Sequence, residues 1–235
     1  MNPEPDSSIG PLGDAAVVVC FGDAIDPEIH DKVMSFAQQI DSSPPPGLVE
    51  HVPAFTTVTL VYDPLVRSFD EFHAAVLDML GSVAPRTVTA ERDPVEIPVC
   101  YGGEHGPDLD FVAAHNDVTP DEVIDIHSGT TYVVYMIGFA PGFPYLGAMS
   151  PRIAAPRLDT PRQAVPAGSV GIAGSQTGIY PIATPGGWRL IGRTPMQLFR
   201  ARAQTPSLLA AGDRVRFVAI TPAEYDAVVA ARAAP

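Results

Sequence analysis

The pattern of hydrophobic and polar positions divides the chain into two parts. From residue 13 to residue 90, hydrophobic runs alternate with amphipathic stretches that have helical spacing. From residue 94 to the end, the hydrophobic runs are short, and glycine and proline separate them. We therefore predict a flexible start over 1–12, a first domain over 13–90 and a second domain over 94–235.

The first part predicts alternating strands and helices. Asp26 can cap a helix that has Pro27 in its first turn, and Ser68 has the capping-box spacing to Glu71 at the start of a second helix. Short β-branched runs predict strands at 15–21, 48–52, 56–62 and 87–90. The order strand, helix, strand, strand, helix, strand is that of a split-βαβ, ferredoxin-like α/β sandwich.

The second part predicts a β-rich domain. Two short helices are expected at 109–116 and 119–126. The composition changes from 94–99 onward, and strands are predicted at 132–138, 168–173, 178–182, 188–193 and 214–219. Many short strands between turns indicate a β-barrel or a sandwich, so the expected fold class is α+β.

Charge is unevenly distributed along the chain. The 235 residues carry a formal net charge of −13, with 23 acidic and 4 basic residues in 1–125 but 4 acidic and 10 basic residues in 126–235. Such a split indicates two units with different partners. The overall acidity argues against general binding of nucleic acid. Lys32 is the only lysine and follows no glycine-rich loop, which excludes a Walker A site.

The sequence gives no sign of a membrane or secreted protein. No hydrophobic run reaches the length of a membrane span, and no signal peptide opens the chain. The two cysteines, Cys20 and Cys100, form neither a disulfide framework nor a metal cluster. We therefore expect a cytoplasmic protein that does not associate with a membrane.

Three segments of the second domain carry candidate chemistry, and the first is 138–147. Its prolines and glycines argue against a helix or a central strand, and it holds the aromatic residues Phe139, Phe143 and Tyr145 beside Pro141. A loop that presents aromatic rings either closes one end of a barrel or forms an apolar wall for a ligand or partner. Both interpretations stay open.

The second segment, 165–180, is rich in glycine. This spacing lets the backbone approach a ligand closely, and successive N–H groups can bind an anion, although tight turns between short strands explain the same pattern. The candidate binding residues in this segment are Gly168, Gly171, Gly174, Gln176, Thr177 and Tyr180.

The third segment, 185–195, contains the only tryptophan, Trp188, and two arginines. Arg189 and Arg193 lie four residues apart, which places them on one face of a strand, where they could bind a carboxylate or phosphate or be ordinary surface arginines. We take Arg193 and His127 as candidate catalytic residues. Asp159 is the only carboxylate in 126–212, so no metal site is expected there.

These segments resemble a known family. The matching stretches are GFAPGFPYLG, a Pro-Arg ladder at Arg152, Arg157 and Arg162, VPAGSVGIAGSQTGIYP, TPGGWRLIGRTP, IPVCYGGEHGPDL and HVPAFTTVTLVYDP. They are similar to the B subunits of bacterial ATP-dependent 5-oxoprolinase, a family that includes allophanate hydrolase subunit 1 and the sensor-kinase inhibitor KipI. One departure is Ser175, where the family pattern has glycine. The resemblance spans nearly the whole chain.

The resemblance implies a ferredoxin-like domain followed by a cyclophilin-like barrel. It also implies partners: a homologous C subunit with its own cyclophilin-like domain, and an A subunit. Together these open 5-oxoproline to glutamate at the expense of ATP, with Mg²⁺ accompanying ATP. We expect this chain to bind no cofactor by itself, because its shortage of carboxylates in 126–212 indicates that a partner or the acidic domain completes the site.

Two other functions stay open within the family. KipI-type members bind a sensor histidine kinase and inhibit it, and the same aromatic segments could take up a kinase segment. Related domains also form the carboxyltransferase half of urea carboxylase. This last function is less favoured, because the one lysine, Lys32, does not lie in a biotin-attachment motif.

Overall fold

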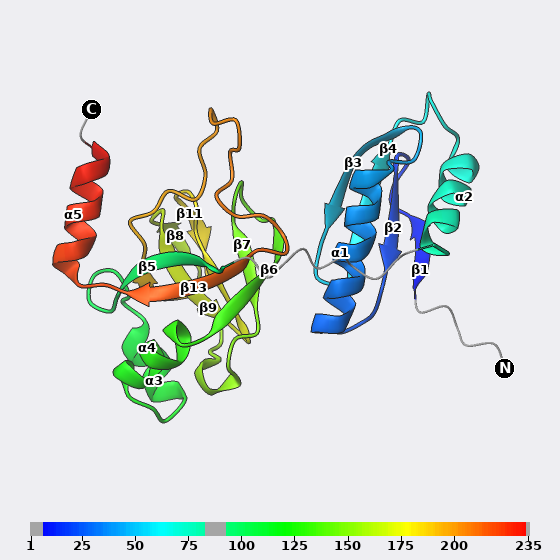
Figure 1. Ribbon diagram of the computed structural model, residues 1–235. Helices are drawn as coiled ribbons and strands as arrows, with labels where there is room; N and C mark the ends of the chain where they lie inside the picture. Colours follow the sequence, from blue (N-terminus) through cyan, green and yellow to red (C-terminus); the bar gives the residue numbers. More distant parts are fainter. Residues whose placement is uncertain (1–6, 83–92, 234–235) are drawn as a thin grey trace. The chain divides into compact units, whose positions relative to one another are not determined.

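The computed structural model describes residues 7–82 and 93–233, and the chain forms two compact units, 1–91 and 92–235 (Figure 1). The elements of the first unit are β1 (Ser8–Pro11), β2 (Ala16–Cys20), α1 (Pro27–Ser42), β3 (Leu48–Pro53), β4 (Thr57–Tyr62) and α2 (Phe69–Leu80). The second unit begins with β5 (Val95–Tyr101), α3 (Leu109–His115), α4 (Pro120–Ser128), β6 (Thr131–Ile137), β7 (Pro144–Gly147) and the 3-10 helix η1 (Pro151–Ile153). It continues with β8 (Arg162–Val165), β9 (Ser169–Ala173), β10 (Gln176–Ile179), β11 (Thr184–Gly186), β12 (Arg189–Arg193), β13 (Arg214–Ala219) and α5 (Pro222–Ala233).

The first unit is an antiparallel sheet in the order β1-β2-β4-β3, with α1 and α2 packed on it. The order of β2, β4 and β3 fits the ferredoxin-like sandwich that the sequence predicts. The outer strand differs, because β1 pairs with β2 and places Ile9 opposite Val19. The prediction that 1–12 is flexible is therefore wrong for Ser8–Pro11, and the strand predicted at 87–90 lies outside the described residues.

Local signals start the helices as the sequence predicts. The Asp26 carboxylate accepts hydrogen bonds from the backbone N–H groups of Glu28 and Ile29. Ser68 and Thr119 each form a complete capping box with the glutamate three residues later. In each case the side chain satisfies backbone donors that the first helical turn leaves free.

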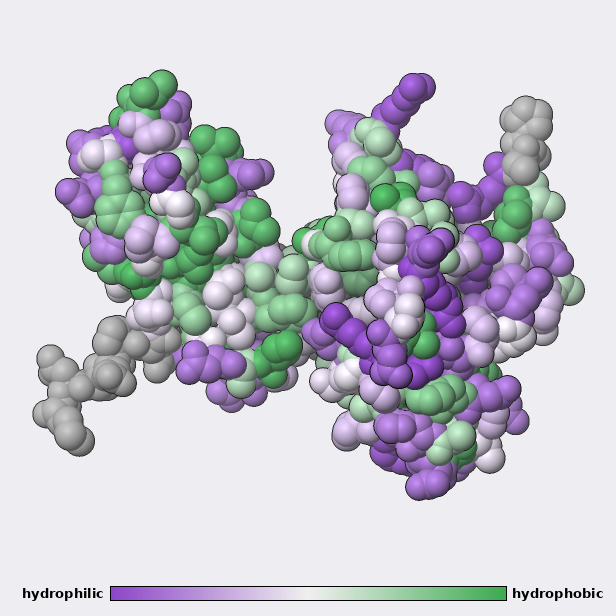
Figure 2. All heavy atoms as spheres, turned by 180° about the vertical axis from the view of Figure 1, so that it is seen from behind, coloured by the Kyte–Doolittle hydropathy of each residue, from purple (hydrophilic) through white to green (hydrophobic). Residues whose placement is uncertain are grey.

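The surface of the first unit includes exposed apolar side chains, and Figure 2 shows apolar surface on this unit. Leu65 is 95% exposed and Val49 is 64% exposed. Single exposed apolar residues are normal on proteins, so these two residues alone assign no function.

The second unit is a closed barrel in the order β10-β7-β6-β13-β5-β12-β9, which β9 closes by pairing with β10. Only β13 and β5 run parallel among these pairs. A two-stranded sheet of β8 and β11 lies beside the barrel strands (Figure 1). Large apolar side chains fill the barrel, including Ile97, Leu146 and Phe217.

Two parts of the second unit differ from the sequence-based expectation. The composition of 138–147 argues against a central strand, yet the last four residues of this segment form β7 between β6 and β10. Pro144 is the first residue of that strand, a position where the missing N–H is tolerated. Helix α5 is absent from the predicted elements, although Thr221 and Glu224 have the capping-box spacing and form the reciprocal hydrogen bonds of that box.

No helix in the described ranges 7–82 and 93–233 is both long enough and apolar enough to cross a membrane.

Candidate functional site

The structure gathers five of the predicted aromatic residues around one pocket of about 260 Å³ on the second unit. Proline and glycine residues, together with an arginine, complete its wall. The lining residues are Phe139, Phe143, Tyr145, Arg157, Pro161, Tyr180, Pro185, Gly186, Gly187 and Trp188. We call this the aromatic pocket.

Phe143 lies at the centre of the aromatic pocket and is almost fully buried. Its ring centroid is 4.9 Å from that of Tyr145, 5.3 Å from Tyr180 and 5.5 Å from Trp188. The contacts to Tyr180 and Trp188 are edge-to-face, an arrangement that aromatic pairs favour. These rings therefore form a packed wall that presents aromatic faces and edges.

Phe139 lies at the rim of the aromatic pocket with 62% of its surface exposed. Its φ angle is +64°, a left-handed conformation that is strained for a bulky side chain. Its ring contacts Phe143 edge-on at 5.4 Å. Strained backbone of this kind is typical of ligand clamps.

Arg157 supplies a positive charge to the aromatic pocket. Within the part of the chain that the structure describes, its guanidinium makes no hydrogen bond or ion pair. Burial raises the pKa of the Tyr145 and Tyr180 hydroxyls, while the nearby Arg157 charge acts on each pKa in the opposite direction. An anion in this pocket would therefore meet an unpaired cation.

The backbone on both sides of Arg157 is fixed. Arg189 Nε donates to the Pro156 carbonyl at 3.2 Å, and the Leu158 N–H donates to the Gly187 carbonyl at 2.8 Å. The Arg189 guanidinium also lies 3.5 Å from the centre of the Phe111 ring. Arg189, predicted as a binding residue, does not line the aromatic pocket and instead holds the segment that carries Arg157.

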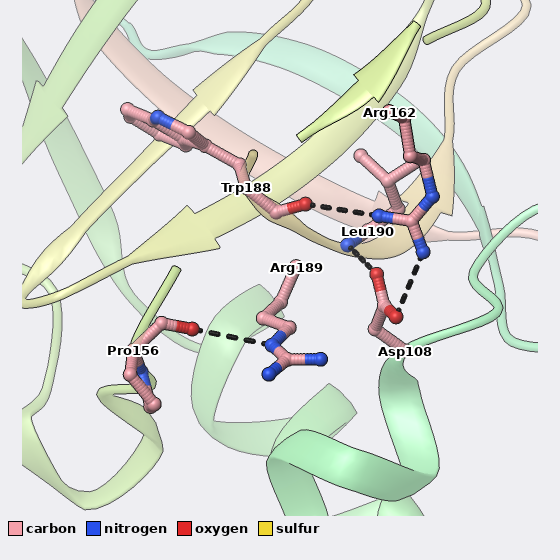
Figure 3. A network of polar contacts seen from close by, with 6 residues as sticks. All are labelled: Asp108, Pro156, Arg162, Trp188, Arg189 and Leu190. Carbon is pink, nitrogen blue, oxygen red and sulfur yellow. Dashed lines mark hydrogen bonds and ion pairs between the residues drawn. The ribbon is translucent and has the colours of Figure 1, made fainter. Parts of the chain in front are cut away.

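An ion pair fixes the other side of the aromatic pocket (Figure 3). Asp108 Oδ1 accepts from Arg162 Nη2 at 2.9 Å, and Asp108 Oδ2 accepts from the Leu190 N–H at 2.6 Å. Arg162 Nη1 donates to the Trp188 carbonyl at 3.3 Å. The indole of Trp188 points away from this network, so the network holds the backbone that places the indole.

Two of the predicted glycines, Gly171 and Gly178, serve the packing of this region. A side chain on Gly178 would meet Phe143 and the Pro144 carbonyl, and one on Gly171 would press on Trp188. Gly168 has φ +85° and lies against the Thr194 carbonyl, whereas Gly174 has φ +57° in the turn between β9 and β10. Gln176 is half-buried in β10, and Pro141 is exposed; neither lines the aromatic pocket.

His127, expected as a catalytic residue, lies in the barrel core and does not line the aromatic pocket, so the structure gives this expectation no support. Its side chain is fully buried and stacks on Phe217 at 4.4 Å. Nδ1 is 2.7 Å from the Tyr101 hydroxyl, and Nε2 is 3.0 Å from the Thr177 hydroxyl. Because Thr177 donates to the Gly171 carbonyl, it accepts from Nε2–H. Burial lowers the pKa of His127 to about 3, so the ring is neutral and structural.

Arg193 and Arg189 do not share a face of β12, contrary to the expectation from their spacing. Ile191 is an extra residue at a bulge, so Arg189 pairs with Ile172 and Arg193 with Ser169. Arg193 lines a separate groove of about 730 Å³ beside α5, where its Nε donates to the Ala167 carbonyl. The two arginines therefore lie in different parts of the second unit.

The sequence-based reasoning missed Arg157, Asp108 and Arg162 as contributors to a site. Arg157 and Arg162 occur in the Pro-Arg ladder, and Pro161 of the same ladder lines the aromatic pocket. The repeated Pro-Arg spacing was the available signal. Asp108 gave none, because its partner is 54 residues away in the chain.

The aromatic pocket can bind but lacks groups for acid–base chemistry. None of its lining residues is a carboxylate or a histidine. Across residues 7–82 and 93–233, no group of three or more His, Cys, Asp and Glu side chains could hold a metal ion.

Comparison with known proteins gives one family. Residues 7–209 match the family model "Carboxyltransferase domain, subdomain C and D". The B subunit of 5-oxoprolinase from Bacillus subtilis is 50% identical over 226 residues, which cover 92% of this chain and 94% of that protein. The corresponding B subunit from Escherichia coli O157:H7 is 40% identical over 209 residues, which cover 88% of this chain and 93% of that protein. The crystal structure of TTHA0988 superposes with a TM-score of 0.78 at 37% identity, over 88% of this chain but 41% of that longer chain.

Proposed function

The chain belongs to the carboxyltransferase C and D domain family and, within it, to the family of 5-oxoprolinase B subunits, and we propose that it works as such a subunit in an ATP-dependent 5-oxoprolinase complex. In that complex it acts with a homologous C subunit and an A subunit to open 5-oxoproline to glutamate.

The aromatic pocket is the observation that carries this proposal. Its rings offer apolar faces to a small ring, and Arg157 offers a cation to a carboxylate. A volume of about 260 Å³ lies below the roughly 300–1,000 Å³ typical of sites for drug-sized ligands. These properties suit a small, partly apolar anion such as 5-oxoproline.

The residues of the aromatic pocket do not fit Mg²⁺-bound ATP. Mg²⁺ is bound through carboxylates and water, and the lining residues contain no carboxylate. Ring opening at the expense of ATP also needs groups that donate and accept protons. We therefore propose that a partner holds ATP and Mg²⁺ and supplies those groups, while this chain holds the organic substrate.

The test is to assemble the chain with its C and A partners and measure ADP release that depends on 5-oxoproline. We expect release from the full assembly, none from the isolated chain, and a strong reduction with Trp188→Ala, which removes a wall of the aromatic pocket. Arg152→Ala serves as a control, because Arg152 is exposed and does not line the pocket. A full assembly that lacks 5-oxoproline-dependent release but lowers the autophosphorylation of a sensor kinase would replace this proposal with kinase inhibition.

A further inference from the structure

We infer that this chain alone, without ATP or partners, binds small cyclic carboxylates in the aromatic pocket, and that Arg157 anchors the carboxylate. The inference deepens the proposed function and rests on it for the identity of the natural ligand. The sequence suggested Arg189 and Arg193 as the arginines that bind the anion, and the inference instead assigns this role to Arg157.

The charge of Arg157 has no counter-ion in the described residues. Arg157 is a lining residue of the aromatic pocket, and the lining contains no acidic residue. Other arginines of this region are engaged: Arg162 binds Asp108, and Arg189 lies on Phe111. Arg157 is therefore the cation in the pocket that remains available to a carboxylate.

The segment that carries Arg157 is held before any ligand binds. Ala155 exchanges two backbone hydrogen bonds with Gly174, at 3.2 and 2.7 Å. Pro156 is held by Arg189, and Leu158 by the Gly187 carbonyl. A fixed backbone on both sides of Arg157 reduces the entropy lost when its side chain binds an anion.

Tyr180 provides a second polar contact at the aromatic pocket. Burial raises the pKa of the Tyr180 hydroxyl, and the neighbouring Trp188 backbone acts on that pKa in the opposite direction. The hydroxyl proton has no acceptor among the described residues. A Tyr hydroxyl both donates and accepts, so this proton can be donated to a ligand carbonyl.

The combination of groups disfavours a cationic ligand. Aromatic boxes that bind cations use the negative faces of their rings, and a guanidinium at the same pocket repels a cation. A flat ring with a carboxylate and a neighbouring carbonyl instead matches the ring faces, Arg157 and the Tyr180 hydroxyl. This class contains 5-oxoproline.

The experiment titrates the isolated full-length chain with 5-oxoproline and follows the emission of Trp188, the only tryptophan, which lies in the pocket wall. 2-Pyrrolidone, which lacks the carboxylate, and cyclopentanecarboxylate, which lacks the lactam carbonyl, are titrated in parallel. Hydrogen bonds to charged groups contribute about 1.5–3 kcal/mol, or roughly 10- to 150-fold in affinity. We expect 2-pyrrolidone to bind the unmodified chain at least tenfold more weakly than 5-oxoproline.

Variants locate the contacts. We expect Arg157→Ala to weaken 5-oxoproline binding about 10- to 100-fold and to abolish the preference over 2-pyrrolidone. Arg152→Ala should leave both unchanged, and Tyr180→Phe should reduce the preference over cyclopentanecarboxylate. Circular dichroism and calorimetric titration accompany each variant, and the comparison of ligands on the unmodified chain needs no variant.

Failure of the inference differs from failure of the proposed function. The inference is overturned if calorimetry and fluorescence detect no binding to the unmodified chain, or if 5-oxoproline and 2-pyrrolidone bind equally. The assembly can still release ADP in that case. If the chain binds 5-oxoproline through Arg157 but the assembly shows no 5-oxoproline-dependent ADP release, the proposed function fails and the binding site stands.

Discussion

Asp108 and Arg162 are joined by an ion pair of 2.9 Å that connects the start of α3 to β8. The carboxylate also accepts the Leu190 N–H, and the guanidinium donates to the Trp188 carbonyl. The two residues of the ion pair therefore each make a hydrogen bond to the backbone of 188–190, one at the Trp188 carbonyl and one at the Leu190 N–H. This relationship makes the wall of the aromatic pocket sensitive to residues that do not line it.

Replacing Arg162 should loosen that wall. Arg162→Ala leaves Asp108, whose side chain is only 10% exposed, without its cation, and such a loss costs about 1–3 kcal/mol in the free energy of unfolding. We also expect a red shift of Trp188 emission and weaker binding of 5-oxoproline. Urea unfolding followed by Trp188 fluorescence measures the stability.

The matched control is Arg216→Ala. Arg216 pairs with Glu96, and both side chains are at least half exposed, so this pair contributes about 1 kcal/mol or less. Equal losses of stability in Arg162→Ala and Arg216→Ala, with an unshifted Trp188 emission, would contradict the structural role given to the Asp108–Arg162 pair.

His127 should make the stability of the barrel depend on pH. The pKa of His127 is about 3 in the folded chain and about 6.5 when unfolded, so below pH 6.5 the unfolded state binds the extra proton. The stabilising contribution is complete above pH 6.5 and decreases as pH falls toward 3, by up to about 1.4 kcal/mol per pH unit. Urea unfolding of the unmodified chain and of His127→Gln, at several pH values from 7 to 5, measures this slope.

His127→Gln should unfold with a shallower pH dependence over that range, even though it is less stable at pH 7. The carboxyls of Glu71, Glu122 and Glu224 have lowered pKa values, so they change the stability at lower pH than His127 does. They are present in both proteins and do not alter the comparison. Parallel pH profiles for the two proteins would show that His127 is not held neutral by burial.

Phe139 should show a conflict between stability and binding. A left-handed conformation costs a non-glycine residue about 1–2 kcal/mol, so Phe139→Gly removes strain at an exposed position. We expect the melting temperature to stay level or rise while 5-oxoproline binds several-fold more weakly, because the rim loses its ring. Thermal unfolding and the fluorescence titration test both halves, and unchanged affinity would show that Phe139 is not part of the site.

Two glycines predicted as binding residues should respond differently to alanine. Gly168→Ala meets both a φ of +85° and the Thr194 carbonyl, and we expect it to lower the free energy of unfolding by more than about 2 kcal/mol. Gly174→Ala meets open space at φ +57°, and about 1 kcal/mol is expected from strain alone. Chemical unfolding of both variants is the measurement; a Gly174→Ala loss as large as that of Gly168→Ala would contradict this difference.

The sequence predicts several elements whose signals are local, although α5, with the equally local capping box of Thr221 and Glu224, is not among them. The caps at Asp26, Ser68 and Thr119 act within three residues, so they are readable from the chain itself. By contrast, β1 contains Gly10 and Pro11, which disfavour strands, and it forms because Ile9 packs on the core of the first unit. Contacts between distant residues override local propensity there.

The residues of the candidate site likewise fall into two groups, those that the sequence indicates and those that only the folded structure identifies. The clustered aromatic residues of 139–145 and Trp188 are conspicuous in the sequence, and the structure brings them together. The choice of arginine could not be made from spacing, because one bulge residue, Ile191, reverses the side on which Arg193 lies. A lone histidine in a polar helix likewise gives no sign that its ring points into a barrel core.

The role of Arg157 as the substrate anchor is tested most sharply by the KM of the assembled enzyme for 5-oxoproline and for ATP. The measurement compares the unmodified chain with Arg157→Ala and Arg193→Ala. We predict that Arg157→Ala raises the KM for 5-oxoproline about 10- to 100-fold and leaves the KM for ATP unchanged, because in the proposed complex this chain holds the ring and its partner holds the nucleotide. Arg193 lies outside the aromatic pocket, so Arg193→Ala should leave the KM for 5-oxoproline unchanged. An unchanged KM for 5-oxoproline in Arg157→Ala, or a raised KM for ATP in that variant, would contradict this division of roles.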